Sequence, residues 1–193
     1  MTIEKAGLPI LSVADLAAWE AWLAAQPRDS KGLWLKLAKA GNTESTLTKA
    51  QAIDGALCHG WIDGQLDSFD GGWFLTRFTP RKARSKWSER NCKRAEELLK
   101  EGRIAPAGRA EIDAAKADGR WDAAYAPAST AAEPDDLKAA LDAEPEARAF
   151  FDTLTGANRY AILYRIQTAK KPETRAARIA KFVAMCARGE TLH

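Results

Sequence analysis

Segments with the two-residue periodicity of β-strands are confined to the first 80 residues, and this limits the possible folds most strongly. Leucines alternate with other residues over 33–38. Further candidates at 61–68 and 73–79 flank Asp70-Gly71-Gly72, whose glycines suit the positive φ values of a tight hairpin. After Pro80 the pattern is helical. We therefore expect an α+β fold: a small, mostly antiparallel sheet with covering helices, followed by an all-helical C-terminal region.

Capping residues and prolines predict where the helices begin. Ser12 is expected to cap a helix that covers the sheet and runs through about Gln26. Thr48 and Gln51 have the spacing of a capping box, and Ser85 is expected to cap a helix that runs to about Lys100. Four prolines suit further helix starts: Pro106, Pro134, Pro145 and Pro172. In the last helix the predicted inward stripe is Ile179, Phe182, Val183 and Cys186.

The Ala/Pro/Ser/Thr-rich stretch 126–133 is the most convincing linker. It predicts an α+β domain at 1–125 and a helical domain at 134–193. A chain of 193 residues buries enough surface to fold without disulfides or metals. The three cysteines, Cys58, Cys92 and Cys186, contain no Cys-x-x-Cys pair, so we expect reduced thiols and neither a zinc site nor another cofactor.

The first twenty residues contain acidic side chains and lack both a basic start and an unbroken apolar stretch. Neither a signal peptide nor a transmembrane segment is therefore expected, and we predict a cytoplasmic location.

The net charge of +3 is distributed unevenly along the chain. Residues 77–94 carry eight Lys or Arg against Glu89 alone, and residues 158–188 carry eight against Glu173 alone. Between them, residues 95–157 hold fourteen acidic and seven basic side chains. Either these segments neutralise one another in the fold and on solvated faces, or a basic segment forms an anion-binding surface.

The segment from Arg77 to Arg94 is the best candidate for that surface, because it interleaves bases with aromatic residues and enters a predicted helix start. The predicted anion-binding groove consists of Arg77, Arg81, Ser85, Trp87, Ser88 and Asn91, with Trp61 and Asp63 as a possible opposite wall. In the alternative interpretation Ser85 only caps the helix, the arginines pair with the acidic middle segment, and Trp87 fills the core.

Catalytic signatures are weak. Cys58 and His59 are adjacent, so on a helix their side chains diverge by about 100° and form a dyad poorly. The other histidine, His193, is the last residue and is expected to be frayed. Asp63 follows His59 closely enough for a carboxylate–imidazole contact or a turn-closing hydrogen bond. Gly-x-Ser-x-Gly, Walker and Rossmann motifs are absent from the sequence.

Ordered motifs along most of the chain resemble the bacterial YdeI/OmpD-associated family, also described as bacteriocin-protection proteins. They are Ala56–Asp63, Arg77–Arg81, Ser85–Asn91, Pro106–Gly108, Ala117–Trp121 with Tyr125, and Ala169–Arg175 with Ile179. The similarity extends from about Gly32 to Gly189. It implies a helical C-terminal domain and a link to outer-membrane porin and antimicrobial-peptide resistance, but no particular reaction or cofactor.

Three functions follow as hypotheses. The first is a cytoplasmic, non-catalytic protein linked to envelope stress or bacteriocin protection, which binds a small anionic ligand or a protein partner. The second is an enzyme acting on a small anionic substrate, with Asp63 or His59 as general base. The third, less favoured, is a nucleic-acid-binding regulator.

Overall fold

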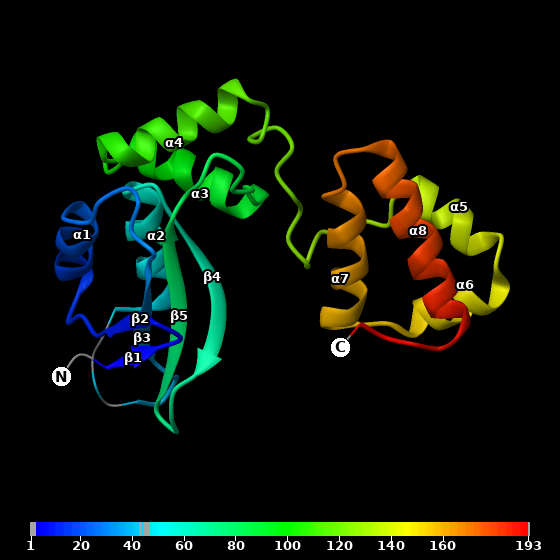
Figure 1. Cartoon of the computed structure of the whole chain (residues 1–193), viewed down its shortest axis with the longest axis horizontal. Helices are drawn as coiled ribbons and strands as arrows, with labels where there is room; N and C mark the ends of the chain where they lie inside the picture. The colour runs from blue at the N-terminus through cyan, green and yellow to red at the C-terminus, as the bar shows by residue number, and fades with distance from the viewer. Residues whose placement is uncertain (1–2, 43, 45–46, 193) are drawn as a thin grey trace. The chain divides into compact units, whose positions relative to one another are not determined.

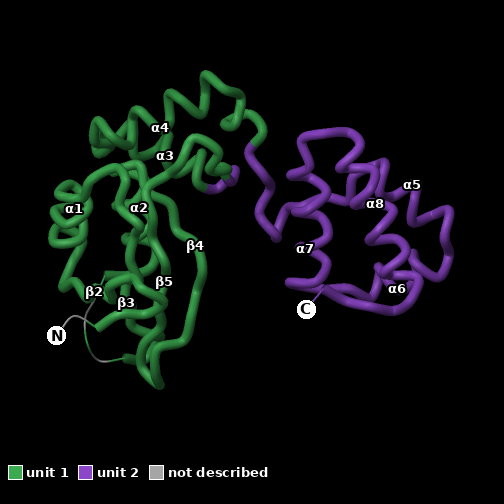
Figure 2. The backbone as a smooth tube through the Cα atoms, viewed as in Figure 1, with its two compact units in different colours: residues 1–87, 91–123 green, residues 88–90, 124–193 purple. Residues whose placement is uncertain are grey.

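The computed structural model describes residues 3–42, 44 and 47–192. Figure 2 shows the two compact units into which the chain divides. Unit 1 comprises residues 1–87 and 91–123, and unit 2 comprises residues 88–90 and 124–193. Each unit has a hydrophobic core of its own.

A mixed five-stranded sheet forms the centre of the described part of unit 1 (Figure 1). Its strands are β1 (Glu4–Lys5), β2 (Leu8–Leu11), β3 (Leu33–Ala38), β4 (Trp61–Ser68) and β5 (Trp73–Pro80). Their order is β1-β2-β3-β5-β4, with β2 and β3 parallel and the other neighbours antiparallel. The α+β class and the three predicted strands are confirmed. β1 and β2 are not predicted from the sequence, because they are too short to show a clear two-residue periodicity.

One face of the sheet is covered by α1 (Leu16–Ala24) and α2 (Lys49–Cys58). The three leucines of β3 are buried there with Phe78 of β5. The ring of Trp19 on α1 packs edge-on against Phe78, with 5.3 Å between centroids, and its Nε1–H donates to the Ala52 carbonyl on α2 at 3.0 Å. The predicted role of the first helix as a cover for the sheet is confirmed.

The opposite face carries Trp34 of β3 directly beside Arg77 of β5. The β1–β2 hairpin reaches across this face, because Lys5 accepts the Trp34 Nε1–H at its carbonyl (3.1 Å) and pairs through Nζ with Asp67 of β4 (2.5 Å). β1 and β4 stand at opposite ends of the strand order, so the ion pair bridges over the strands between them. Leu8 packs against Trp34 in a small apolar cluster. We call this surface the hairpin-side face.

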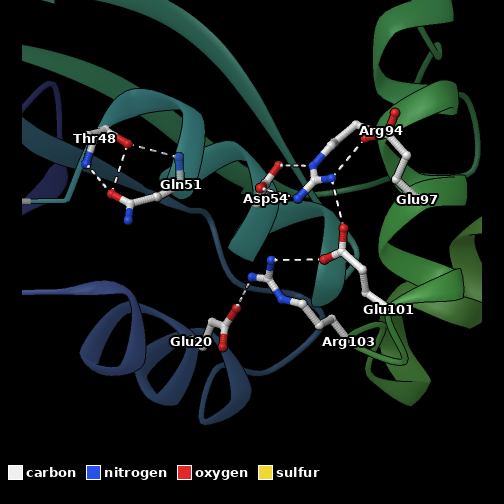
Figure 3. A network of polar contacts seen from close by, with 8 residues as sticks. All are labelled: Glu20, Thr48, Gln51, Asp54, Arg94, Glu97, Glu101 and Arg103. Atoms are coloured by element: carbon white, nitrogen blue, oxygen red, sulfur yellow. Dashed lines mark hydrogen bonds and ion pairs between the residues drawn. The ribbon is translucent and has the colours of Figure 1, made fainter.

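Both ends of α2 are fixed by local contacts. The predicted capping box is confirmed: Thr48 Oγ1 accepts the Gln51 N–H at 3.2 Å, and Gln51 Oε1 accepts the Thr48 N–H at 3.0 Å (Figure 3). At the other end, α4 (Pro106–Ala117) begins at the predicted proline and packs closely. A Cβ on Gly108 would lie 2.7 Å from the Leu57 carbonyl oxygen, so the approach requires glycine.

Two predicted helix starts are wrong. Asp15, not Ser12, caps α1, because its carboxylate accepts a backbone N–H of the first turn at 2.8 Å. α3 (Glu89–Lys100) begins four residues after Ser85. The Ser85 hydroxyl is used instead to accept the Lys82 N–H at 2.9 Å, which closes a turn before the helix.

The β4–β5 hairpin is confirmed, but its turn differs from the prediction. Neither Gly71 nor Gly72 has a positive φ. The Asp70 carboxylate instead accepts the N–H groups of Gly72 and Trp73 at 2.9 and 3.0 Å. An aspartate that bonds the backbone two residues on forms the turn without a left-handed conformation.

The described part of unit 2 folds into four helices: α5 (Asp135–Asp142), α6 (Pro145–Thr153), α7 (Gly156–Gln167) and α8 (Pro172–Ala187). α8 contacts the other three. Its predicted inward stripe is confirmed, since Ile179, Phe182, Val183 and Cys186 are all buried. The three predicted proline starts are confirmed to within one residue, with Pro134 immediately before α5.

Charged side chains join α1, α2 and α3 in the network of Figure 3. Its members are Glu20, Asp54, Arg94, Glu97, Glu101 and Arg103. Arg94 of α3 donates two hydrogen bonds to Asp54 of α2, at 2.9 and 2.8 Å. Arg103 pairs with Glu20 of α1 at 3.1 Å. Each guanidinium therefore faces carboxylates, and the network holds the helices together rather than offering charge to a ligand.

Replacing Arg94 by methionine is expected to lower the free energy of unfolding by about 2 kcal/mol, because the carboxylate of Asp54 loses a two-pronged partner. Arg109→Met is the matched control, since Arg109 pairs with Asp113 in an exposed contact four residues along α4. That control should change stability by less than about 0.5 kcal/mol. Urea denaturation measures both, and equal effects would contradict the structural role of the network.

Candidate functional site: a basic hollow on the sheet

Two adjoining hollows open on the hairpin-side face of unit 1. One has a volume of about 500 Å³ and a wall that includes Leu8 and Trp34. The other has a volume of about 480 Å³ and a wall that includes Ser30 and Thr79. Both share the lining residues Lys31, Gln65, Arg77 and Lys82. We call the two together the basic hollow.

The start of β3 places Lys31 at this hollow. Gly32 follows it with a φ of +92°, and a Cβ there would lie 2.7 Å from Thr79 Cγ2 and collide with the Phe78 carbonyl oxygen. The chain therefore passes tightly against β5 at this point, as only glycine permits. This passage sets Lys31 beside the end of β5.

A β-bulge places Gln65 opposite Arg77. In the β4–β5 register Asp63 pairs with Phe78 and Leu66 pairs with Thr76. Two residues of β4 therefore oppose Arg77 alone, which is the arrangement of a bulge. The bulge bends the edge strand where the hollow lies, and the turn closed by Ser85 brings Lys82 to the same place.

The three cations of the basic hollow have no ion pair with any carboxylate in the part of the chain that the structure describes. In addition, the Nε of Arg77 is buried and has no hydrogen-bond partner among the described residues. A buried donor without an acceptor is costly, and three like charges around one hollow repel each other. The lining therefore carries three cations against the single carboxylate of Asp63, and this excess of positive charge favours an anion.

The basic segment 77–94 is expected either to be neutralised by acidic segments or to form an anion-binding surface. Its residues divide between the two. Arg94 pairs with Glu97 and Glu101 of the acidic middle segment. Five others have no ion pair with a carboxylate of residues 3–42, 44 and 47–192: Arg77, Lys82, Arg84, Arg90 and Lys93. Local neutralisation is therefore incomplete in this segment.

Of the predicted groove residues, Arg77 and Asp63 line the basic hollow. Asp63 shares its side of the sheet with its partner Phe78, because directly opposed residues point the same way, so its side chain belongs to the helix-covered face. Trp61 is buried on that face against Trp22, at 5.6 Å between ring centroids. Asn91 lies in the first turn of α3.

Arg81 and Trp87 form a buried stack away from the hollow's lining. The Arg81 guanidinium lies 3.5 Å from the centre of the Trp87 ring and donates to the Lys86 carbonyl at 3.1 Å. Trp87 also packs against Trp121, at 4.8 Å between centroids. Ser85 accepts a hydrogen bond from Arg120 at its carbonyl. These contacts give Arg81, Ser85 and Trp87 a role in holding the chain before α3.

Ser88, the remaining predicted residue, groups with unit 2, where it forms an isolated bridge with Tyr125. Sequence reasoning missed Lys31, Gln65, Lys82 and Trp34 as lining residues. Lys31 carries a weak signal, because it stands before a glycine at a strand start. Gln65 carries none, because only the bulge brings it opposite Arg77.

Neither Cys58 nor His59 lines the basic hollow. Burial raises the pKa of the Cys58 thiol to about 11, so it is protonated at neutral pH and a poor nucleophile. Burial also lowers the pKa of His59, the cap residue at the end of α2, against an opposing influence of Glu20. His193 lies outside the described residues.

The lowered pKa of His59 predicts a pH-dependent loss of stability. Below an unfolded pKa of about 6.5 the unfolded chain binds a proton that the folded chain resists, so stability is full above that pH and falls as the pH drops towards the folded value. Comparing urea midpoints at pH 7.5 and about pH 5.5 should show a smaller drop in His59→Asn than in the unmodified protein. Equal drops would show that His59 titrates normally.

Unit 2 has a hollow of its own, of about 400 Å³, between α5 and α8. Its cation, Arg175, donates to both carboxylate oxygens of Asp136, at 2.5 and 2.8 Å. The Arg175 hydrogen bonds are the main cause of the lowered pKa of Asp136. Because Arg175 is already paired with Asp136, the hollow of unit 2 is not lined by cations without a carboxylate partner, as the basic hollow is.

Among the described residues no three His, Cys, Asp or Glu side chains gather as metal ligands. None of the described helices is long and apolar enough to cross a membrane.

Two family models match the chain. Residues 11–111 match a domain of unknown function, DUF8412. This range of the chain contains all four lining residues that the two lobes of the basic hollow share. Residues 130–189 match the family described as "Bacteriocin-protection, YdeI or OmpD-Associated", which confirms the predicted resemblance for this C-terminal part of the range from Gly32 to Gly189. Neither the curated proteins nor the solved structures gave a match. The chain therefore belongs to the DUF8412 family over its N-terminal half and carries a YdeI- or OmpD-associated, bacteriocin-protection domain at residues 130–189.

Proposed function

We propose that this protein is a non-catalytic binding protein that takes a small anionic ligand into the basic hollow. The observation that carries the proposal is that Lys31, Arg77 and Lys82 line the same hollow and lack a carboxylate partner among the described residues. A bound anion would relieve the repulsion between the cations and give the buried Arg77 Nε an acceptor.

The chemistry of the lining supports binding over catalysis. The four shared side chains are two lysines, an arginine and a glutamine, and their amide and cationic groups orient an anion. Of the candidate bases, His59 ends α2 outside the lining of the hollow, and Asp63 lines one lobe but belongs by its strand register to the helix-covered side of the sheet. General acid–base catalysis needs a titratable group within hydrogen-bond reach of the substrate.

The description of the C-terminal family supports a biological setting of bacteriocin protection, and we place this protection within the response to envelope stress. In this proposal the protein acts in the cytoplasm, where ligand binding by unit 1 contributes to protection. Growth of a deletion strain under bacteriocin, complemented with the unmodified protein or with Lys82→Ala, tests the setting. Cell fractionation tests the location.

Lys82→Ala tests the proposed site directly. We expect the affinity for inorganic phosphate to fall about tenfold, because one charge-assisted contact contributes about 1.5 kcal/mol. Arg84→Ala is the matched control, since Arg84 is exposed in the same turn and does not line the basic hollow. Isothermal titration at fixed ionic strength measures both. Equal losses in the two variants would indicate diffuse attraction by surface charge and would contradict a defined site.

A further inference from the structure

Building on the proposed function, we infer that the ligand of the basic hollow is a small phosphate monoester, bound as a dianion. The charge of the whole lining selects it over a carboxylate and over a phosphodiester. Lys31, Arg77 and Lys82 bring three positive charges, and Asp63 brings the one negative charge of the lining. Two positive charges therefore remain, which a dianion neutralises and a monoanion does not.

The three cations reach the hollow from separate parts of unit 1. Lys31 precedes β3 at the tight passage of Gly32 along β5, and Arg77 belongs to β5 itself. Lys82 lies in the turn that the Ser85 hydroxyl closes. The backbone thus holds the cations around one space without the help of a ligand. At a given distance a dianion interacts with each cation twice as strongly as a monoanion does, so this lining distinguishes ligands by their charge.

The donor groups of the lining also suit a terminal phosphate. The planar guanidinium of Arg77 matches two oxygens of one anion, and each lysine ammonium acts as a compact point charge. Gln65 adds an amide from β4 at the β-bulge. A phosphate monoester carries close to two negative charges at neutral pH and presents three acceptor oxygens. A carboxylate or a phosphodiester presents only two terminal oxygens, and each carries a single charge.

The hollow has room for the organic part of a monoester. Its two lobes, of about 500 and 480 Å³, each lie within the roughly 300–1,000 Å³ of pockets that hold small organic ligands. Uncharged polar groups line it beside the cations. Ser30 accepts the Gly32 N–H at its hydroxyl oxygen (3.2 Å), which leaves the hydroxyl proton available to donate, and Thr79 is a second hydroxyl residue in the lining. These groups suit an organic part that carries oxygen atoms.

The test compares methyl phosphate with dimethyl phosphate and acetate by isothermal titration of the full chain at pH 7.5 and one ionic strength. Methyl phosphate is the dianionic monoester, whereas the other two each carry one negative charge. We expect methyl phosphate to bind at least tenfold more tightly than either of them.

The preference for the monoester should also depend on pH. The second pKa of a phosphate monoester is about 6, so at about pH 5 roughly nine in ten molecules are monoanions. The preference over dimethyl phosphate should then shrink to about twofold. Dimethyl phosphate keeps its charge, so it corrects for titration of the other charged groups near the hollow, which are Asp63 in the lining and the Lys5–Asp67 ion pair across the same face.

Lys31→Gln connects the preference to the hollow. Loss of one cation costs a dianion twice the binding free energy that it costs a monoanion. We therefore expect methyl phosphate to bind about tenfold more weakly and dimethyl phosphate about threefold more weakly. Arg84→Gln is the matched control, because Arg84 is exposed and lies outside the lining, and it should change both affinities by less than about twofold. Equal losses for both ligands in Lys31→Gln would contradict selection by charge.

The outcomes separate the two proposals. Equal affinities for methyl phosphate, dimethyl phosphate and acetate would overturn the monoester and leave the anion site standing. Tighter binding of dimethyl phosphate would overturn it in favour of a phosphodiester. If none of the three binds, the proposed function itself fails. Binding to phosphatidic acid vesicles without binding of glycerol 3-phosphate would place the monoester on a lipid surface and overturn a small ligand.

Discussion

Replacing Gly32 by alanine is expected to destabilise unit 1 by about 4 kcal/mol or more. Gly32 has a φ of +92°, a conformation that costs an L-residue about 1–3 kcal/mol. The new Cβ would also lie 2.7 Å from Thr79 Cγ2 and overlap the Phe78 carbonyl oxygen, so β3 and β5 would have to separate. These strands carry the buried centre of the helix-covered face, so the strain reaches the core.

Gly71→Ala provides the control for this prediction. Gly71 lies in the β4–β5 turn, has no positive φ, and a Cβ there meets no atom within 4 Å. Its replacement should change the free energy of unfolding by less than about 0.5 kcal/mol, or raise it slightly by restricting the unfolded chain. Urea denaturation followed by tryptophan fluorescence measures both variants. A Gly32→Ala protein as stable as Gly71→Ala would contradict the packing at the start of β3.

Arg77→Leu is expected to weaken phosphate binding about 10- to 100-fold, because a guanidinium that bonds an anion contributes about 1.5–3 kcal/mol. The same variant should keep or slightly increase its stability. Arg77 has no ion pair with a described carboxylate and a buried, unsatisfied Nε, so leucine removes both repulsion and an uncompensated donor. Loss of binding without loss of stability distinguishes a ligand-binding residue from a structural one.

Isothermal titration and thermal denaturation of the same preparation test this pair of effects. Arg84→Leu is the control, because it removes an exposed positive charge outside the basic hollow. It should leave both affinity and melting temperature nearly unchanged. If Arg77→Leu lowered the melting temperature and bound phosphate normally, Arg77 would be a structural residue of the sheet.

Much of the fold could be predicted where a local interaction determines it. The Thr48–Gln51 capping box, the prolines of the later helices and the alternation of β3 each act within a few residues, and all are confirmed. The predictions based on Ser12 and Ser85 failed because other local contacts replace them, and at α1 the cap is Asp15. A serine hydroxyl can close a turn as readily as it caps a helix, and at Ser85 the turn prevails.

The β1–β2 hairpin could not be predicted, because its stability comes from distant contacts. β1 has two residues, and the hairpin is held by Lys5 through its ion pair with Asp67 and its hydrogen bond from Trp34. No local pattern encodes these partners. The parallel pairing of β2 with β3 depends on the same tertiary arrangement.

In the candidate site, too, some features follow from local sequence and others depend on distant contacts. The basic segment correctly draws attention to Arg77, yet Arg81 and Trp87 from the same segment are buried in a stack. Tertiary packing decides this difference, because Arg77 lies on β5 whereas Arg81 and Trp87 follow the end of that strand and pack on each other before α3. The β-bulge that brings Gln65 opposite Arg77 has no sequence signature. Composition therefore identifies the charge, and tertiary structure selects the residues that present it.

The most direct test of the central claim is an NMR titration of the ¹⁵N-labelled chain with inorganic phosphate. The account predicts saturable shifts of the backbone amides of Lys31, Gln65, Arg77 and Lys82, which line the basic hollow. Shifts that do not saturate, or that centre on the exposed cations Arg84, Arg90 and Lys93, would contradict a built anion site.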